Sequence, residues 1–303
     1  MNPRTKLIML PATLIILSAV AWAAIGTVNV AGAQKNTLIA RAHKGELAPS
    51  FDKPIFILVL GGDARAGNPT HPRTDSIHIL AINPTTMSAS IVGIPRDSYV
   101  DIPGHGKAKI NEAGHDGGPQ LAVQTVERLS GCRFNYYMLT NFQGFAKLVS
   151  DFGGITIRVR KPMYEACCSH VNLSAGVHRV KGGQALAFAR DRHTVANGDF
   201  TRSENQGLLM IGALDTARKD YKGDVATPLR ALASLLRSVN LNIPLGEALR
   251  LGMFAMRLDP KHVTNVVVKG QIGTAGKASI VKITSQGLHQ LFDVCRDAIL
   301  GNG

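Results

Sequence analysis

Short apolar runs that end in glycine or polar residues alternate along this chain with segments of helical periodicity. The first run, residues 54–60, is continuously apolar and ends at Gly61-Gly62, which is typical of a buried strand leading into a loop. Residues 77–83 and 88–94 predict two more strands, and the turn residues Asn83-Pro84 between them predict a hairpin. Because strands and helices alternate, we expect an α/β fold: a mixed central sheet with helices on both faces.

Further elements continue this alternation to the end of the chain. Asn141 is a suitable N-cap for one helix, and Gly131 lies where a C-cap belongs for another. The predicted helices cover residues 119–129, 142–152, 183–190, 200–221, 228–239, 245–256 and 284–300. The predicted strands cover residues 134–140, 155–159, 263–269 and 279–283, whereas residues 160–182 show no regular pattern.

The N-terminal region contains a long uncharged segment, residues 7–33, which Arg4 and Lys6 precede. About 20 residues, at about 1.5 Å each, are enough to cross the hydrocarbon core of a bilayer. The segment therefore predicts a signal-anchor transmembrane helix, with a cleavable signal peptide ending at Ala31-Gly32-Ala33 as the alternative. The predicted organisation is a cytoplasmic tail at 1–6, the anchor at 7–33, a linker at 34–52 and an extracytoplasmic domain at 53–303.

The 303 residues carry a formal net charge of +13, with a pI near 9.9. Such an excess favours an anionic partner, whether nucleic acid, anionic lipid or a phosphorylated polymer, although simple solubility explains it as well. Aromatic residues make up only 5% of the chain and lysine and arginine form no basic arm. Nucleic acid is therefore not the partner that we expect.

The four cysteines are Cys132, Cys167, Cys168 and Cys295, and their spacing does not fit a zinc site. An even number of cysteines in an exported protein favours two disulfides, for which three connectivities are possible. A bond between adjacent cysteines is strained, so we expect Cys167 and Cys168 to pair separately with Cys132 and Cys295. Free buried thiols are the alternative.

Short phrases of arginine and aspartate stand at the ends of several apolar runs. Asp63 and Arg65 follow the first strand, Arg73-Thr74-Asp75 precedes the next, and Arg96-Asp97 follows the hairpin. Ligands of open α/β sheets bind in crevices outside strand ends, so we expect these side chains to share one cleft. Arginine matches phosphate oxygens and aspartate is a ligand that Mg²⁺ prefers. The phrases thus predict a site for a di- or triphosphate and its metal, with local salt bridges as the alternative.

Taken in order, these phrases resemble the LytR–CpsA–Psr (LCP) family. Leu60-Gly61-Gly62-Asp63-Ala64-Arg65 looks like the opening of an LCP domain, and Gly182-Gly183-Gln184-Ala185-Leu186-Ala187-Phe188-Ala189-Arg190-Asp191-Arg192-His193 is the strongest later match. The resemblance covers about residues 54–216. The other matching segments are residues 73–75, 94–103, 109–111, 117–119, 141–145, 151–155 and 198–202, together with Gln206.

The resemblance implies a membrane-anchored, single-pass enzyme whose catalytic domain faces the cell wall. It implies a phosphotransferase that moves a glycopolymer from a polyprenyl-pyrophosphate carrier to a peptidoglycan hydroxyl, assisted by Mg²⁺ (or Mn²⁺). The expected partners are therefore the lipid-linked glycopolymer, peptidoglycan and membrane lipid. The Ala, Gly and Val content and the cysteines suit an actinobacterial member of the family.

The same resemblance assigns roles to individual residues. Asp63 and Asp75 are the expected metal ligands, and either one is the candidate general base. His193 is interpreted as a hydrogen-bonding neighbour of the arginines that clamp the phosphates. The expected catalytic residues are Arg65, Arg73, Arg96, Asp97, Arg190, Arg192, Arg202 and Gln206.

A polyprenyl tail needs an apolar pocket. The alternative role for apolar residues near the motifs is ordinary core packing, and a long tail enters between sheet and helices only where the core is left open. The residues expected to line the pocket are Leu121, Val126, Phe142, Phe145, Leu148 and Val149.

Other functions stay open at the level of sequence. A pyrophosphatase that uses water as the acceptor would carry the same motifs, because the acceptor leaves no motif of its own. A nucleic-acid-binding regulator would use the positive charge, and a non-catalytic wall-binding module would bind polymer without the arginines.

Overall fold

A seven-stranded mixed sheet forms the centre of the fold in the computed structural model, which describes residues 36–63, 73–194, 197–220 and 239–300. The strand order is β12-β1-β7-β2-β3-β4-β13. The neighbours β2 and β7 run parallel, whereas β3 and β4 form the predicted antiparallel hairpin. The strands are β1 (Thr37–Arg41), β2 (Ile55–Asp63), β3 (Arg73–Asn83), β4 (Ser88–Gly93), β7 (Tyr136–Asn141), β12 (Asn240–Asn242) and β13 (Val263–Val267).

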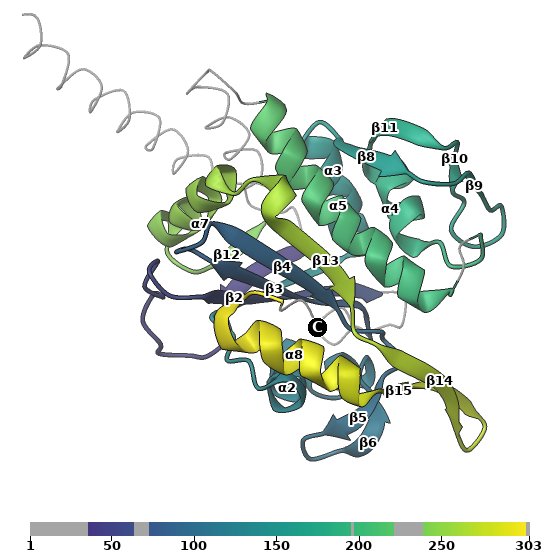
Figure 1. The fold of residues 1–303 in the computed structure, drawn as a ribbon, viewed down its shortest axis with the longest axis horizontal. Helices are drawn as coiled ribbons and strands as arrows, with labels where there is room; N and C mark the ends of the chain where they lie inside the picture. The colour runs from purple at the N-terminus through teal and green to yellow at the C-terminus, as the bar shows by residue number, and fades with distance from the viewer. Residues whose placement is uncertain (1–35, 64–72, 195–196, 221–238, 301–303) are drawn as a thin grey trace, which may run out of the picture. The chain divides into compact units, whose positions relative to one another are not determined.

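Helices cover both faces of this sheet, so the predicted fold class is confirmed (Figure 1). On one face, α2 (Glu112–Ser130) and α8 (Ser285–Asp297) bury Val126 and Leu291 in a core shared with β2, β3 and β4. The other face is covered by α3 (Phe142–Asp151), α4 (Gly182–Arg190), α5 (Asp199–Asp220) and α7 (Leu245–Arg257).

Four two-stranded antiparallel sheets and one short 3-10 helix complete the described part of the fold. These sheets pair β5 (Tyr99–Ile102) with β6 (Gly106–Lys109), β8 (Ile155–Val159) with β11 (Gly176–Val180), β9 (Met163–Tyr164) with β10 (Asn172–Leu173), and β14 (Gly270–Ala275) with β15 (Ala278–Ile283). The 3-10 helix η3 spans Pro260–His262.

Local signals explain several of these boundaries. The Asn141 side chain accepts a hydrogen bond from the backbone N–H of Gly144 at 2.8 Å, so it caps α3 as predicted. Gly131 ends α2 in the left-handed region, with φ of 73°. The buried carboxylate of Glu247 receives hydrogen bonds from Arg41 and Tyr136, which attaches α7 to the sheet.

The predicted linker at 34–52 is wrong in part, because Thr37–Arg41 is strand β1. It pairs antiparallel with β7 from Thr37↔Thr140 to Arg41↔Tyr136. The globular unit therefore begins at Asn36 rather than at residue 53. The signal was the short apolar run Leu38-Ile39-Ala40, which lies within an otherwise polar segment.

Two predictions fall on other parts of the chain. The anchor predicted at 7–33 and the helix predicted at 228–239 lie outside the described residues. Within the described ranges, no helix is both long enough and apolar enough to cross a bilayer.

The predicted cysteine pairing is wrong. Cys132 is bonded to Cys295, and the adjacent Cys167 and Cys168 are bonded to each other. Cys132 is buried in the core between α2 and α8, and its Cα lies 4.8 Å from that of Cys295. Cys167 and Cys168 lie in the loop between β9 and β10, on the side of the other helices. The fold thus keeps Cys167 and Cys168 away from Cys132 and Cys295, the partners that we predicted for them.

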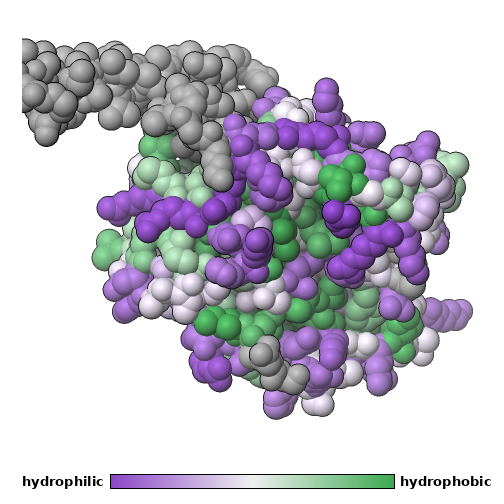
Figure 2. Space-filling model, turned by 45° about the horizontal axis from the view of Figure 1, so that its top comes forward, coloured by the Kyte–Doolittle hydropathy of each residue, from purple (hydrophilic) through white to green (hydrophobic). Residues whose placement is uncertain are grey.

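On the face shown in Figure 2, apolar residues gather in the middle and lower part, among hydrophilic ones. Exposed large apolar side chains occur on several elements, including Met253, Ile272 and Phe292. Such scattered residues are normal for a soluble surface.

Candidate active site

A cavity of about 580 Å³ lies between the central sheet and the helices α3, α4 and α5. Most of its lining is apolar, and it extends along β3 as far as Leu80 and Ile82. Close to the Thr140 end of β7 the lining becomes charged. The polar lining residues at that end include Asp75, Ser76, Arg96, Thr140, Asn141, Arg190, Arg192, His193, Arg202 and Gln206.

A β-bulge at the start of β3 explains how adjacent residues both reach this cavity. Gly61 of β2 pairs with Ser76, but the next residue, Gly62, pairs with Thr74, which leaves Asp75 as the extra residue. A bulge redirects side chains that would otherwise alternate between the two faces of a sheet. Asp75 and Ser76 therefore both line the cavity.

Two arginines and two aspartates form a compact charge cluster at the polar end, which we call the Asp75–Arg96–Asp199–Arg202 cluster. Arg96 Nη1 donates to Asp75 Oδ1 at 2.9 Å, and Arg96 Nε lies 3.6 Å from Asp199 Oδ1. Arg202 Nη2 lies 2.8 Å from Asp199 Oδ1 and donates to the backbone carbonyl of Asp75 at 2.9 Å. The signs alternate, so each charge has an opposite neighbour.

The pKa values of the two arginines of the cluster shift in opposite directions. Burial alone would lower the pKa of Arg96, but the charge and hydrogen bond of Asp75, with Asp199 and Asp97, outweigh it and raise the pKa. Burial lowers the pKa of Arg202, and Asp199 offsets only part of that effect. Both guanidinium groups stay charged, because arginine starts from a very high pKa.

Arg190 and Arg192 lie outside this cluster. The Arg190 guanidinium lies 4.9 Å from the centre of the Phe142 ring, and Arg192 Nε lies 3.4 Å from His193 Nε2. Neither is paired with a carboxylate of the residues that the structure describes. Gln206 donates to the Ala189 carbonyl at 3.1 Å, which holds the end of α4 against α5.

Asp191, between these two arginines, fixes the turn that carries them. It is fully buried and accepts hydrogen bonds from the backbone N–H groups of His193 and Thr194, at 3.2 and 3.4 Å, and from the Thr194 hydroxyl. Sequence reasoning did not assign it a role. An aspartate after a helix, followed by a threonine, is a recognisable turn signal.

The remaining residues predicted as catalytic or metal-binding lie outside the charge cluster or outside the described residues. Arg65 lies outside the described residues, and the side chain of Asp63 is not described either, although its backbone pairs with Arg73. Arg73 is exposed at the start of β3. Asp97 binds Lys109 Nζ at 2.9 Å and lies 3.9 Å from Arg96 Nε.

Four of the six residues predicted for the apolar pocket line the cavity, and two do not. Phe142, Phe145, Leu148 and Val149 all belong to α3 and line it. The assignment of Leu121 and Val126 is wrong: both belong to α2 and pack in the core on the opposite face of the sheet. Helical periodicity identifies an apolar face, but not which face of the sheet it covers.

Asp199 is the residue that sequence reasoning missed. Its side chain is only 17% exposed, and neither carboxylate oxygen has a hydrogen-bond partner of good geometry, although Arg202 is at ion-pair distance. A buried carboxylate with spare acceptor capacity fits a divalent cation. The signal was present in the phrase Gly198-Asp199-Phe200-Thr201-Arg202, where we considered only the arginine.

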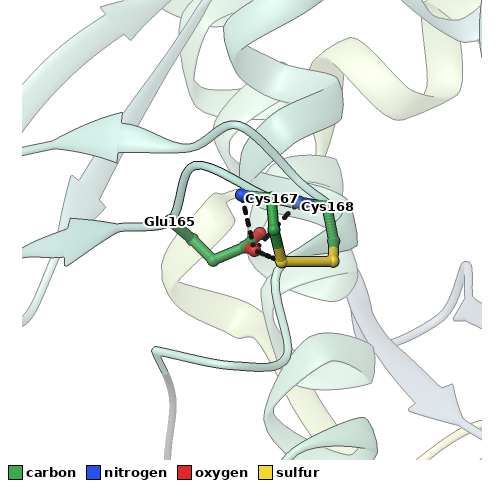
Figure 3. A group of neighbouring side chains, drawn as sticks. All are labelled: Glu165, Cys167 and Cys168. Atoms are coloured by element: carbon green, nitrogen blue, oxygen red, sulfur yellow. Dashed lines mark hydrogen bonds between the residues drawn. A yellow bond between two sulfur atoms is a disulfide. The ribbon is translucent and has the colours of Figure 1, made fainter.

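Within the described residues, the aspartates near the cavity do not form a group of three close metal ligands. The one such group comprises Glu165, Cys167 and Cys168 (Figure 3). Its sulfur atoms are bonded to each other, and the carboxylate accepts hydrogen bonds from the backbone N–H groups of Cys167, Cys168 and Ser169. Hydrogen bonds from Ser169 lower the pKa of Glu165 to about 2. This loop is therefore a structured turn at the cavity lining rather than a metal site.

The LytR_cpsA_psr family matches residues 23–294, which is most of the chain. The chain belongs to this family. The resemblance inferred from the motif phrases is thereby confirmed, and the match extends beyond residue 216, where the motifs had become indistinct.

Individual relatives of this LytR_cpsA_psr protein are similar over about two thirds of its length. It is 35% identical to the regulatory protein MsrR of Staphylococcus aureus over 216 residues, 70% of this chain. It is 34% identical to the polyisoprenyl-teichoic acid–peptidoglycan teichoic acid transferase TagU of Bacillus anthracis over 195 residues, 64% of this chain. The matched regions span 63% and 61% of those relatives.

A solved structure, TagT bound to LI-WTA, has the same fold. The TM-score is 0.66 at 26% sequence identity, and the match covers 84% of this chain and 94% of that one. The mixed sheet with helices on both faces is therefore the family architecture.

Proposed function

We propose that this protein transfers a glycopolymer, as a sugar phosphate, from a polyprenyl-pyrophosphate carrier to a peptidoglycan hydroxyl. The observation that carries the proposal is the cavity itself, which is apolar along most of its length and lined by arginines at one end. A prenyl diphosphate has the same two-part chemistry. The name of TagU describes such a transfer, and TagT binds LI-WTA, which supports the proposal by relationship.

The arginines divide into two groups with different roles. Arg96 and Arg202 each have an aspartate partner and organise Asp75 and Asp199. Arg190 and Arg192, which have no such partner among the described residues, are the donors available to the diphosphate oxygens. Arginine binds phosphate through parallel N–H groups, so the two arginines on either side of Asp191 suit the two phosphates.

In the transfer, the acceptor hydroxyl oxygen forms a bond to the phosphorus that bears the sugar. The bond from that phosphorus to the bridging oxygen breaks, and prenyl monophosphate leaves. The hydroxyl proton passes to Asp63 or Asp75, the two carboxylates considered from the sequence. Arg190 and Arg192 stabilise the charge on the phosphoryl oxygens, which is the main requirement of such a step.

A divalent cation fits the acidic side of the same site. Asp75 and Asp199 would hold it, because Asp199 retains unused acceptor capacity and Asp75 lines the cavity. Mg²⁺ or Mn²⁺ bound there would neutralise charge on the diphosphate. Arg96 and Arg202 would keep the two carboxylates in place.

The predicted anchor at 7–33 completes the proposal, because a carrier lipid stays in the bilayer. With this segment as a transmembrane helix, the globular unit from Asn36 onward lies outside the cell membrane, facing peptidoglycan. A nucleic-acid-binding regulator receives no support from the site, since its arginines line an apolar cavity.

The proposal is tested with the full-length protein in detergent, a synthetic prenyl-pyrophosphoryl sugar, Mg²⁺ and peptidoglycan fragments. We expect a covalent sugar phosphate on the fragments and release of prenyl monophosphate, both measured by mass spectrometry. Sugar phosphate released to water, with fragments unmodified, would instead show a hydrolase. Binding without turnover would show a non-catalytic module.

Substitution of Arg190 and Arg192 checks the assignment of the phosphate site. We expect Arg190→Ala and Arg192→Ala each to lower kcat/KM by about tenfold to a hundredfold, because a charge-assisted hydrogen bond contributes about 1.5–3 kcal/mol. Arg296→Ala is the matched control, since Arg296 is an exposed arginine on α8. Equal activity of all three variants would contradict the assignment.

A further inference from the structure

A buried histidine adjoins the polar end of the cavity without lining it. His78 is two residues after Ser76 on β3, so both side chains point to the same face of the sheet. His78 is fully buried, whereas Ser76 lines the cavity. His78 Nδ1 lies 3.2 Å from Ser76 Oγ, and Nε2 lies 3.0 Å from the backbone carbonyl oxygen of Ser203 on α5.

These contacts determine which ring nitrogen of His78 carries the proton. A carbonyl oxygen only accepts hydrogen bonds, so Nε2 must be the donor to Ser203. Burial lowers the pKa of His78 to about 4, although the bond to Ser203 opposes this, so the ring is neutral near pH 7. Nδ1 then has a free lone pair, and the Ser76 hydroxyl donates its only proton to it. The Ser76 oxygen is left with acceptor capacity alone.

Two glycines on the neighbouring strands allow this close arrangement. A Cβ on Gly61 would lie 2.8 Å from Ser76 Cβ. A Cβ on Gly93 would lie 2.3 Å from Ser203 Oγ and 3.1 Å from His78 Nε2. The 2.8 Å and 2.3 Å distances are shorter than a Cβ adopts without a shift of its neighbours, so glycine on β2 and β4 leaves space for Ser76, His78 and Ser203.

The fixed orientation of the Ser76 hydroxyl determines which ligand groups it can bind. Arg190 and Arg192, which line the same cavity and have no carboxylate partner among the described residues, are donors, as a diphosphate requires. A hydroxyl that can only accept repels phosphate oxygens but suits a ligand that donates. On the basis of the proposed function, we propose that Ser76 receives a hydroxyl of the acceptor glycan and that His78 is the positioning residue that orients Ser76 for this. The pair thus separates the acceptor subsite from the phosphate subsite.

Three variants of the full-length protein test this division. Ser76→Ala removes the acceptor oxygen. His78→Asn places an amide oxygen near the position of Nδ1 and keeps an acceptor for Ser76, whereas His78→Gln places an amide N–H near Nε2 and keeps only the bond to Ser203. Ser203→Ala is the control, because it removes a hydroxyl 3.5 Å from Nε2 but leaves the Ser203 carbonyl.

We expect Ser76→Ala and His78→Gln to raise the KM for the peptidoglycan acceptor by about three- to tenfold, the loss expected for one neutral hydrogen bond. The Kd for the prenyl-pyrophosphoryl sugar should stay unchanged. His78→Asn and Ser203→Ala should stay near the wild-type acceptor KM, with melting temperatures measured for every variant. In a Ser76→Ala background, His78→Gln should add nothing further, because the two changes remove the same interaction.

Four results would overturn the inference, and the NMR result is independent of turnover. An unchanged acceptor KM in Ser76→Ala overturns it while leaving the proposed function intact. The same holds if His78→Gln keeps the wild-type acceptor KM while His78→Asn is impaired. That pattern would show that the bond of His78 to Ser203 is purely structural. A nitrogen NMR spectrum showing His78 protonated on Nδ1 at pH 7 overturns it as well. Absence of any transfer by the wild-type protein overturns the proposed function and the role of Ser76 with it.

Discussion

At the scale of single residues, the site depends on charges that neutralise one another before a ligand arrives. In the Asp75–Arg96–Asp199–Arg202 cluster every charge adjoins an opposite one, and the Arg202 side chain is only 8% exposed. A buried charge that loses its partner costs far more than the pair contributes. Single substitutions in the cluster should therefore affect folding as well as activity.

Asp199→Asn tests this coupling with a change of charge and almost no change of shape. We expect the free energy of unfolding to fall by about 1–3 kcal/mol, because Arg202 loses its partner while still buried. Urea unfolding at pH 7 measures the change. Asp215→Asn, on the same helix, is the control: its partner Lys219 is exposed, so a change below about 0.5 kcal/mol is expected. Equal effects of the two substitutions would contradict a buried cluster.

His78 gives the stability of the protein a defined pH dependence. Its pKa is about 4 in the folded protein and about 6.5 when unfolded, so between these values only the unfolded chain takes up the proton. The contribution of His78 is therefore complete above pH 6.5 and is lost as the pH falls toward 4, by about 3 kcal/mol in total. Unfolding of wild type and His78→Gln at pH 7 and pH 4.5 measures it. The wild type should lose more stability, and parallel losses would contradict the assignment.

At the scale of elements, the wall of the cavity depends on how closely α4 approaches α3. A Cβ on Gly182, the first residue of α4, would lie 2.0 Å from the backbone carbonyl oxygen of Ala146 and 2.6 Å from Ser150 Oγ. Backbone cannot yield as a side chain does, so the glycine sets the distance between the two helices. That distance in turn places Arg190 at the other end of α4.

Gly182→Ala should therefore separate the two helices. We expect a loss of about 1–3 kcal/mol in the free energy of unfolding, the usual cost of overpacking. The adjacent Gly183 is the matched control, because a Cβ there would have nothing within 4 Å. Gly183→Ala should be neutral or should stabilise by up to about 1 kcal/mol, since alanine favours a helix. Chemical denaturation measures the free energy of unfolding of both variants. A Gly182→Ala variant as stable as the wild type would show that the helices are free to move apart.

The elements were largely predictable from sequence, and their placement was less so. The β3–β4 hairpin and the Asn141 cap follow from local chemistry, which short segments contain in full. The bulge at Asp75 and the assignment of α2 to the opposite face depend on contacts between distant segments. Of the predicted arginines, Arg96, Arg190, Arg192 and Arg202 line the cavity, whereas Arg73 does not, and Asp199 was missed.

At the scale of the whole described fold, the two faces of the sheet serve different purposes. The α2–α8 face is filled by side chains, whereas the face under α3, α4 and α5 contains the cavity. An open cavity forgoes the packing that stabilises a core. The filled face must therefore supply much of the stability, and it is there that Cys132 joins the end of α2 to α8.

The Cys132–Cys295 disulfide should accordingly be the more important of the two for stability. It connects residues 163 positions apart, so it removes much entropy from the unfolded chain, whereas the Cys167–Cys168 bond encloses almost no chain. We expect Cys132→Ala with Cys295→Ala to lower the free energy of unfolding by about 2–5 kcal/mol, and Cys167→Ser with Cys168→Ser to lower it by less than about 1 kcal/mol. Alkylation and mass spectrometry of the exported wild type should find no free thiol. Four alkylated cysteines would contradict both bonds, and similar losses in the two double variants would show that the filled face does not depend on its disulfide.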